Sequence, residues 1–190
     1  MNKVGLIILY TLVFIVNIFI IYFCYNLYTK KNIKKDFEII NNYSINKKLD
    51  EIIIKNTPVY DNLTKEELIN KINNNLYNEL SGYGEYIVNK TLGYNMNPYL
   101  VVAIMLEETG CSYSCSKILK TKNNVGGMKG INGYMSFNTL EEGINKYIDN
   151  LYYNYYSKGL TTPELMNPKY AESTLWASKI NKYINKIKNN

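Results

Sequence analysis

Residues 4–28 form an almost entirely apolar segment, and this segment limits what the chain can fold into more than any other feature. It carries no charged residue; Asn17 interrupts it and Asn26 lies near its end. A helix of about 20 apolar residues is long enough to span a bilayer. A cleaved signal peptide would have a shorter apolar region followed by small residues, and neither is seen here. The sequence therefore predicts an uncleaved transmembrane anchor over residues 1–29, with the lipid bilayer as one partner.

The charges that flank this segment leave its orientation open. Lys3 precedes it, whereas Lys30, Lys31, Lys34 and Lys35 follow it. The positive-inside rule would then place the body of the chain in the cytoplasm. However, every one of the 22 basic residues is lysine, and lysine, asparagine, isoleucine and tyrosine dominate the chain, as is typical of an AT-rich genome. This bias weakens the rule, so a cytoplasmic and an extracytoplasmic body both remain open.

The chain contains no histidine, which excludes several kinds of site. Ser-His-Asp and Cys-His nucleophilic sites and HExxH zinc sites all need that residue. Arginine is also absent and no basic stripe carries aromatic residues, which argues against nucleic acid as a partner. We expect no metal or organic cofactor, and the chemistry is left to carboxylates, tyrosine, lysine and amides. The net charge of +6 fits either an ordinary solvated surface or attraction to an anionic one such as the cell wall.

Residues 30–62 are polar and rich in asparagine and lysine, and we interpret them as a spacer before one domain at residues 63–190. Capping residues, prolines and glycines predict that this domain is mostly helical. The expected helices cover about 64–80, 83–92, 98–108, 139–156 and 174–187, with a short helix from 162 that Asn167-Pro168 ends and a short strand at 133–137. Asn138 to Glu141 fits a capping box for the fourth helix. Cys111 and Cys115 are four residues apart, which leaves a disulfide between them possible but unfavourable in a regular helix.

Glu108 closes the helix predicted at 98–108, which is apolar on nearly every face. Desolvation on such a helix and the negative end of the helix dipole both favour the neutral carboxylic acid. A protonated carboxylic acid is what glycoside cleavage requires for the leaving oxygen. Glu107 occupies the neighbouring face. Composition and spacing alone are equally compatible with two exposed glutamates at a helix end.

The residues around Glu108 resemble a known family. Glu108-Thr-Gly110, then Asn123-Asn-Val-Gly-Gly-Met-Lys-Gly130, then an aromatic strand with Tyr134, then Tyr170-Ala171, are similar in order to the bacterial glucosaminidase domain of autolysins and phage lysins, over about residues 76–187. The resemblance implies an all-α, lysozyme-like fold with a small β-hairpin flanking a cleft. It also implies cleavage of peptidoglycan glycan strands by an endo-β-N-acetylglucosaminidase-like enzyme at the outer face of the cell membrane.

The same resemblance implies roles for single residues. The catalytic glutamate of the family directly precedes [Ser/Thr]-Gly, which selects Glu108 over Glu107, and Tyr170 matches the tyrosine near that glutamate. Among the substrate-binding residues, Asn123 and Asn124 are expected to bond the sugar or to brace their loop. The other substrate-binding residues implied are Gly126, Gly127 and Tyr134. Trp176 is interpreted as a packing anchor rather than a sugar platform.

The family often has a second carboxylate after the glycine-rich loop, whereas this chain has no acidic residue between Glu108 and Glu141. Assistance by the substrate's own N-acetyl group, or attack by one of its hydroxyl groups, would then complement a single acid. The second route is that of lytic transglycosylases, which are one alternative function. A non-catalytic wall-binding or scaffolding module of an envelope-spanning apparatus is the other. The sequence gives no indication of the oligomeric state.

Overall fold

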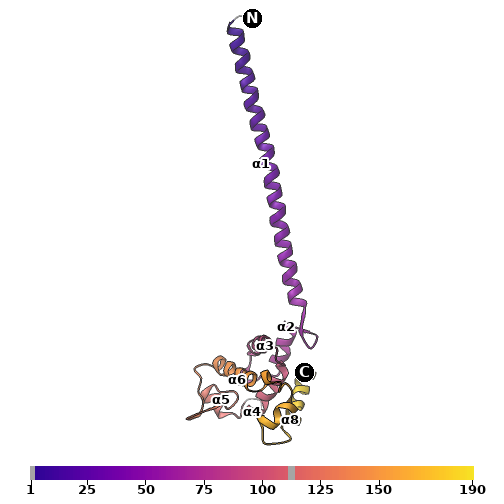
Figure 1. Cartoon of the computed structure of the whole chain (residues 1–190), viewed down its shortest axis with the longest axis vertical. Helices are drawn as coiled ribbons and strands as arrows, with labels where there is room; N and C mark the ends of the chain where they lie inside the picture. The colour runs from indigo at the N-terminus through magenta and orange to yellow at the C-terminus, as the bar shows by residue number, and fades with distance from the viewer. Residues whose placement is uncertain (1–2, 111–113) are drawn as a thin grey trace. The chain divides into compact units, whose positions relative to one another are not determined.

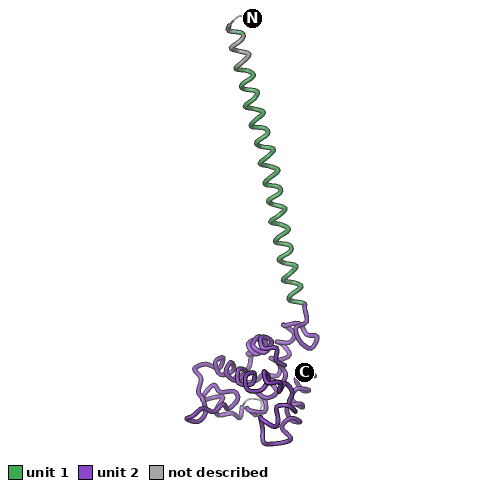
Figure 2. Tube along the Cα trace, in the orientation of Figure 1, with its two compact units in different colours: residues 1–56 green, residues 57–190 purple. Residues whose placement is uncertain are grey.

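The computed structural model describes residues 3–110 and 114–190. The chain divides into two compact units, residues 1–56 and residues 57–190 (Figure 2). The possible disulfide between Cys111 and Cys115 involves Cys111, which lies outside the described residues.

The first unit is a single helix, α1 (Lys3–Asn56), which is 54 residues long (Figure 1). It continues without a break through residues 30–56, where the sequence indicates a polar spacer, because no glycine or proline occurs between residues 6 and 57. Pro58 then disfavours helical geometry in the residue before it. Apolar side chains between Leu12 and Tyr28 are exposed. The described part of α1 is long and apolar enough to cross a membrane, and this exposure distinguishes it from a buried core helix.

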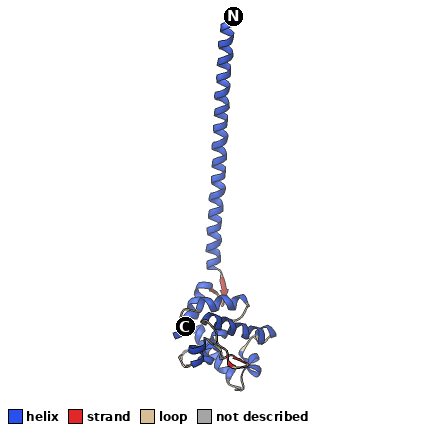
Figure 3. Ribbon diagram, turned by 90° about the vertical axis from the view of Figure 1, so that its left-hand side faces the viewer, coloured by secondary structure: helices blue, strands red, loops and turns tan. Residues whose placement is uncertain are grey.

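The described residues of the second unit are mostly helical, as predicted, with two small antiparallel strand pairs (Figure 3). Its elements in chain order are β1 (Pro58–Tyr60), β2 (Leu63–Thr64), α2 (Lys65–Asn73), η1 (Asn78–Leu80), α3 (Gly84–Gly93), α4 (Pro98–Thr109), α5 (Lys117–Lys122), β3 (Lys129–Gly130), β4 (Gly133–Tyr134), α6 (Leu140–Asn154), η3 (Tyr156–Lys158), α7 (Pro163–Tyr170) and α8 (Trp176–Asn189). The β3–β4 pair is the small hairpin expected of a lysozyme-like domain, although it is shorter than the strand predicted at 133–137.

Two helix starts follow the capping signals in the sequence. Thr64 caps α2, since its hydroxyl accepts the Glu67 N–H at 3.3 Å and the Glu67 carboxylate accepts the Thr64 N–H at 2.8 Å. Asn97 caps α4, where its Oδ1 accepts the N–H of Tyr99 at 2.9 Å and Pro98 occupies the first turn. Such caps satisfy backbone donors that a helix leaves without partners.

Other local predictions are wrong. Helix α2 ends at Asn73 rather than near Leu80, because three consecutive asparagines follow Ile72 and asparagine side chains compete for backbone hydrogen bonds. The cap of α6 is Thr139 rather than Asn138, and its hydroxyl accepts the N–H of Glu142 at 3.1 Å. The Glu142 carboxylate in turn accepts the N–H of Asn138 at 2.9 Å.

Helix α7 also differs from the prediction, since it continues through Pro168 to Tyr170. A proline inside a helix removes one backbone hydrogen bond. Here the Asn167 side chain ties the end of α7 to the next segment, because it donates to the carbonyl of Ser173 at 2.9 Å and accepts the N–H of Ala177 at 3.1 Å. This tertiary bracing holds a turn that local propensity alone disfavours.

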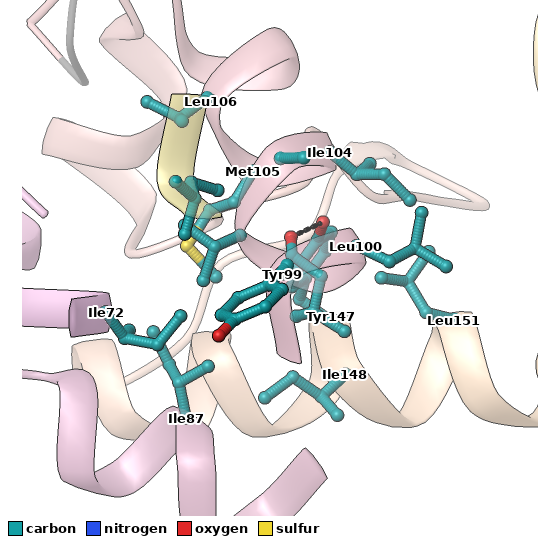
Figure 4. Close-up of a cluster of buried hydrophobic side chains, with 14 of the residues drawn as sticks. Ile72, Ile87, Tyr99, Leu100, Ile104, Met105, Leu106, Tyr147, Ile148 and Leu151 are labelled. Carbon is teal, nitrogen blue, oxygen red and sulfur yellow. Dashed lines mark hydrogen bonds between the residues drawn. The ribbon is translucent and has the colours of Figure 1, made fainter. Parts of the chain in front are cut away.

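Helix α4 forms the centre of the second unit, with every residue from Pro98 to Leu106 buried. It packs most extensively against α8, and also against α2 and α3. From α6, the buried hydroxyl of Tyr147 donates to the carbonyl of Val101 at 3.1 Å (Figure 4). Burial of each such large apolar side chain contributes about 1.5–3 kcal/mol. The packing of these buried side chains therefore fixes the position of α4 within the second unit.

Candidate active site

Glu108 lies in the last turn of α4, where the helix leaves the core. The residues up to Leu106 are buried, whereas Glu108 is exposed on one side. Gly110 ends the helix with a φ of 59°, a left-handed value that glycine adopts without strain. The carboxylate is thus carried by the most rigid helix of the unit, at the point where that helix reaches the surface.

Tyr170, the last residue of α7, contacts Glu108 directly. Its hydroxyl donates to Oε1 of Glu108 at 2.8 Å, although the two residues are 62 positions apart in the chain. The structure thus brings together the two residues that the sequence predicts to be catalytic.

The surroundings of Glu108 favour its protonated form. Burial by neighbouring side chains raises the pKa of the Glu108 carboxyl above its ordinary value, the Tyr170 hydrogen bond acts in the opposite direction, and the charge of Glu107 adds to the rise. Burial also raises the pKa of Tyr170 far above its usual range, and the adjacent Glu108 raises it further. Tyr170 therefore keeps its proton and remains a donor, while Glu108 is the group that titrates.

Glu107 differs from its neighbour, because Nζ of Lys179 in α8 lies 3.1 Å from its Oε1. Glu108 has a hydroxyl partner instead of a cation. The elements that pack on α4 thus give the two adjacent glutamates different partners, a lysine from α8 for Glu107 and a tyrosine from α7 for Glu108.

An aromatic cluster holds Tyr170 in place. Its ring stacks on Trp176 with centroids 4.6 Å apart and lies 5.2 Å from the ring of Tyr155. Trp176 is buried, which agrees with its interpretation as a packing anchor. Burial raises the pKa of Tyr155, and the Glu108 charge raises it further, so Tyr155 also adjoins the site. The sequence did not reveal Tyr155 or Lys179, because nothing distinguishes them among 20 tyrosines and 22 basic residues.

The two asparagines of the glycine-rich loop brace that loop. Asn123 ends α5 with a φ of 52°, and its side chain donates to the carbonyl of Phe137 at 3.0 Å. Asn124 is completely buried. Its Oδ1 accepts the N–H of Met128 at 2.8 Å and its Nδ2 donates to the carbonyls of Met128 and Met135, each at 2.9 Å. These contacts correspond to the second of the two roles that the sequence left open for the asparagines.

The glycines allow this loop to pass close to other parts of the unit. A Cβ atom on Gly126 would lie 2.5 Å from the ring of the buried Tyr147. Gly127 has a φ of 59° and faces the ring of Tyr134. Tyr134 itself is exposed on β4, and the ammonium of Lys129 lies 5.5 Å from its ring centroid. Of the five residues that the resemblance implies for substrate binding, Tyr134 is the exposed one.

The contacts of the candidate residues divide them into two separate groups. Glu108 and Tyr170 contact each other, whereas Asn123, Asn124 and the glycines contact α6, Phe137 and the hairpin. A cavity of about 530 Å³ lies where α7 meets α8, and one of its lining residues, Ala171, follows Tyr170 in the sequence. The cavity is lined by Glu164, Asn167, Pro168, Ala171, Glu172, Thr174 and Ala177. Glu108 is not part of that lining, so the cavity alone does not identify the site.

Three carboxylates that could be considered as a second catalytic group, those of Glu107, Glu141 and Glu142, each have another partner in the structure. Within the described part of the chain, the carboxylate whose charge acts on the Glu108 pKa is that of Glu107, which is paired with Lys179. Glu141 accepts a hydrogen bond from Tyr83 at 3.0 Å, and Glu142 accepts the N–H of Asn138 at 2.9 Å. The described residues also include no group of three or more histidine, cysteine, aspartate or glutamate side chains that could hold a metal ion.

A comparison with protein families agrees with the resemblance seen in the sequence. The family model described as mannosyl-glycoprotein endo-beta-N-acetylglucosaminidase, named glucosaminidase, matches residues 84–189, which is more than half of the chain. The matched region includes α3 to α8 and hence every candidate residue named above. Among curated proteins, none matches the chain significantly.

Proposed function

The chain belongs to the glucosaminidase family of glycosidases, and we propose that it cleaves the glycan strands of peptidoglycan with Glu108 as the general acid. The observation that carries this proposal is the hydrogen bond of 2.8 Å between Tyr170 and Glu108, made at a carboxyl whose pKa is raised by burial. A carboxylic acid whose pKa is raised, at the end of a buried helix, is suited to protonate a leaving oxygen.

In the proposed reaction, Glu108 transfers its proton to the glycosidic oxygen as the bond between that oxygen and the anomeric carbon breaks. Tyr170 orients the carboxyl, because its own proton is held firmly and its ring is fixed against Trp176. The carbonyl oxygen of the substrate's N-acetyl group attacks the anomeric carbon, and a water molecule then opens the resulting ring. Glu108, now ionised, takes a proton from that water and returns to its starting state.

Two alternatives remain beside hydrolysis. In a lytic transglycosylase, a hydroxyl group of the substrate attacks the anomeric carbon in place of water, which gives an anhydro sugar. This route also needs only one acid, and the pairing of Glu107 with Lys179 favours it as much as it favours the N-acetyl route. A wall-binding or scaffolding role would need no catalytic acid, and the raised pKa of Glu108 argues against it.

The products distinguish these functions. We expect the purified protein to release fragments with a reducing N-acetylglucosamine end from purified peptidoglycan, as measured by mass spectrometry before and after borohydride reduction. Fragments one water lighter, which resist reduction, would assign the transglycosylase reaction instead. Release of no fragment from walls of several chemotypes would contradict both enzymatic functions and favour the scaffolding role.

We further propose that α1 anchors the protein in the cell membrane and that residues 57–190 lie on the outer side, where peptidoglycan is found. The apolar, exposed first part of α1 supports the anchor. The lysines that follow residue 29 oppose this orientation by the positive-inside rule.

A protease test decides the orientation. Protease added to intact protoplasts is expected to digest residues 57–190 while a cytoplasmic marker protein stays whole. Full protection of the body until the protoplasts are lysed would place it in the cytoplasm, away from the proposed substrate.

A further inference from the structure

Two hollows lie side by side along the seam between α3 and α6. The first, of about 300 Å³, is lined by Gly82, Tyr83, Glu85, Tyr86, Asn89 and Glu141. The second, of about 360 Å³, is lined by Tyr86, Asn89, Lys90 and Asn145. Because Tyr86 and Asn89 line both, the hollows form one continuous depression, which we call the α3–α6 groove.

A tyrosine platform continues the groove beyond Lys90. The rings of Tyr94 and Tyr152 are stacked 4.1 Å apart at 4°, and Tyr153 meets both edge-on. Tyr153 is 58% exposed. An exposed aromatic side chain that is held by two neighbouring rings offers a binding surface at little cost in conformational entropy.

Polar contacts fix the same platform. The Tyr94 hydroxyl donates to Asp149 at 2.7 Å, and the Lys90 ammonium lies 2.8 Å from the same carboxylate. That ammonium also lies 4.8 Å from the centroid of the Tyr94 ring. Lys90 therefore joins the groove to the platform, and the two form one surface with a defined shape.

The chemistry of this surface favours a sugar over other ligands. Tyrosine, asparagine and glutamate make up six of the eight residues that line the groove, and none of the eight is leucine, isoleucine, valine or methionine. A lipid tail or an apolar helix would therefore find little to bind. Glu85, Glu141 and Asp149 outnumber Lys90 and Lys146, whose charges act on Asp149, although the chain as a whole has a net charge of +6. This local charge disfavours nucleic acids and anionic lipid surfaces.

We propose that the α3–α6 groove and its tyrosine platform form a second, non-catalytic binding site for N-acetylated glycan strands. Sugar rings pack their apolar faces on tyrosine, while hydroxyl and acetamido groups bond to the asparagine amides. The choice of glycan rests on the proposed function, whereas the site itself is separate from Glu108. Its occupant increases the time that the protein spends on an insoluble wall.

The test measures binding by a form that does not cleave. Full-length protein carrying Glu108→Gln, purified in detergent micelles, is sedimented with purified insoluble peptidoglycan over a range of protein concentrations. Adding Tyr153→Ala or Asn89→Ala is expected to weaken the apparent affinity by about tenfold, the loss that follows from removing one well-formed contact. Both side chains are exposed, so neither change removes core packing.

Tyr77→Ala is the matched control, because Tyr77 is 41% exposed and lines neither hollow. It is expected to bind as the Glu108→Gln parent does. Groove variants that melt like the parent and bind as tightly would overturn the inference, as would parent binding to DNA in preference to glycan. If wild type cleaves glycan but the groove variants lose no affinity, this inference alone fails. If wild type cleaves nothing but the groove variants lose affinity, the proposed function fails and the groove stands.

Discussion

Replacing Glu108 by glutamine is expected to lower the rate of glycan cleavage by about 10²- to 10⁴-fold, the contribution that general acid catalysis typically makes. Glutamine keeps the shape of glutamate and can still accept the hydrogen bond of Tyr170, but it has no proton to give to the leaving oxygen. Dye release from labelled peptidoglycan, measured at substrate saturation, gives the loss in kcat.

Glu107→Gln provides the matched control on the same helix turn. It removes the ion pair with Lys179 but leaves Glu108 and Tyr170 in place, so the rate is expected to fall much less. A Glu108→Gln protein with nearly wild-type activity, or a Glu107→Gln protein that is the inactive one, would show that the acid is assigned to the wrong residue.

The raised pKa of Glu108 also predicts how the activity of the wild type, and its stability relative to Glu108→Gln, depend on pH. A general acid must be protonated, so activity falls as the pH rises through its pKa, and burial places that fall above the ordinary carboxyl value of 4.5. The same shift has a consequence for stability. Because the folded-state pKa is raised, the protonated form stabilises the fold at low pH, and this stabilisation is lost as the pH rises through the folded pKa. Glu108→Gln should therefore melt slightly above wild type at neutral pH, with the difference vanishing near pH 4.

Replacing Gly143 by alanine is expected to destabilise residues 57–190 by about 2 kcal/mol or more, as overpacking of a closely packed site does. A Cβ atom on Gly143 would lie on the backbone carbonyl oxygen of Asn123, well inside contact distance, and 3.3 Å from the ring of Phe137. The obstacle is backbone rather than a flexible side chain, so α6 or the glycine-rich loop must move. Better helix propensity recovers only about 1 kcal/mol of the loss.

Thermal unfolding followed by circular dichroism measures this effect, which corresponds to a fall in Tm of roughly 5–10 °C. Gly93→Ala is the matched control, since it also lies in a helix and a Cβ atom there would meet nothing within 4 Å. It is expected to leave Tm unchanged or to raise it by reducing the freedom of the unfolded chain. Equal melting of the two variants would mean that α6 does not pack as closely on the loop as the structure indicates. A displaced loop should also lower glycan binding by Gly143→Ala.

Features that depend on neighbours in the chain were determined by the sequence itself. The apolar run predicts a long exposed helix, because periodicity and length act locally. Thr64 and Asn97 start helices through bonds to residues two or three positions away, so their spacing is sufficient to identify them. The helical class of the body follows from the same local signals. The order of motifs around Glu108 predicted a family to which the chain indeed belongs.

Contacts between distant residues were decided only by the tertiary structure. The sequence gives no distance between Glu108 and Tyr170, and only the packing of α7 and α8 against the end of α4 joins them. The same packing gives Glu107 a lysine partner and so separates two glutamates that are adjacent in the chain.

Helix ends show the same division. Asn138 and Thr139 are both of a type that caps helices, and the structure shows Thr139 in that position. Local rules stop α7 at Pro168, yet the side chain of Asn167 holds two more residues in the helix. Those residues include Tyr170, so a bond that no local pattern encodes positions the partner of the proposed acid. The physical reason is that capping and periodicity act over a few residues, whereas burial and long-range hydrogen bonds act between segments that meet only in the folded chain.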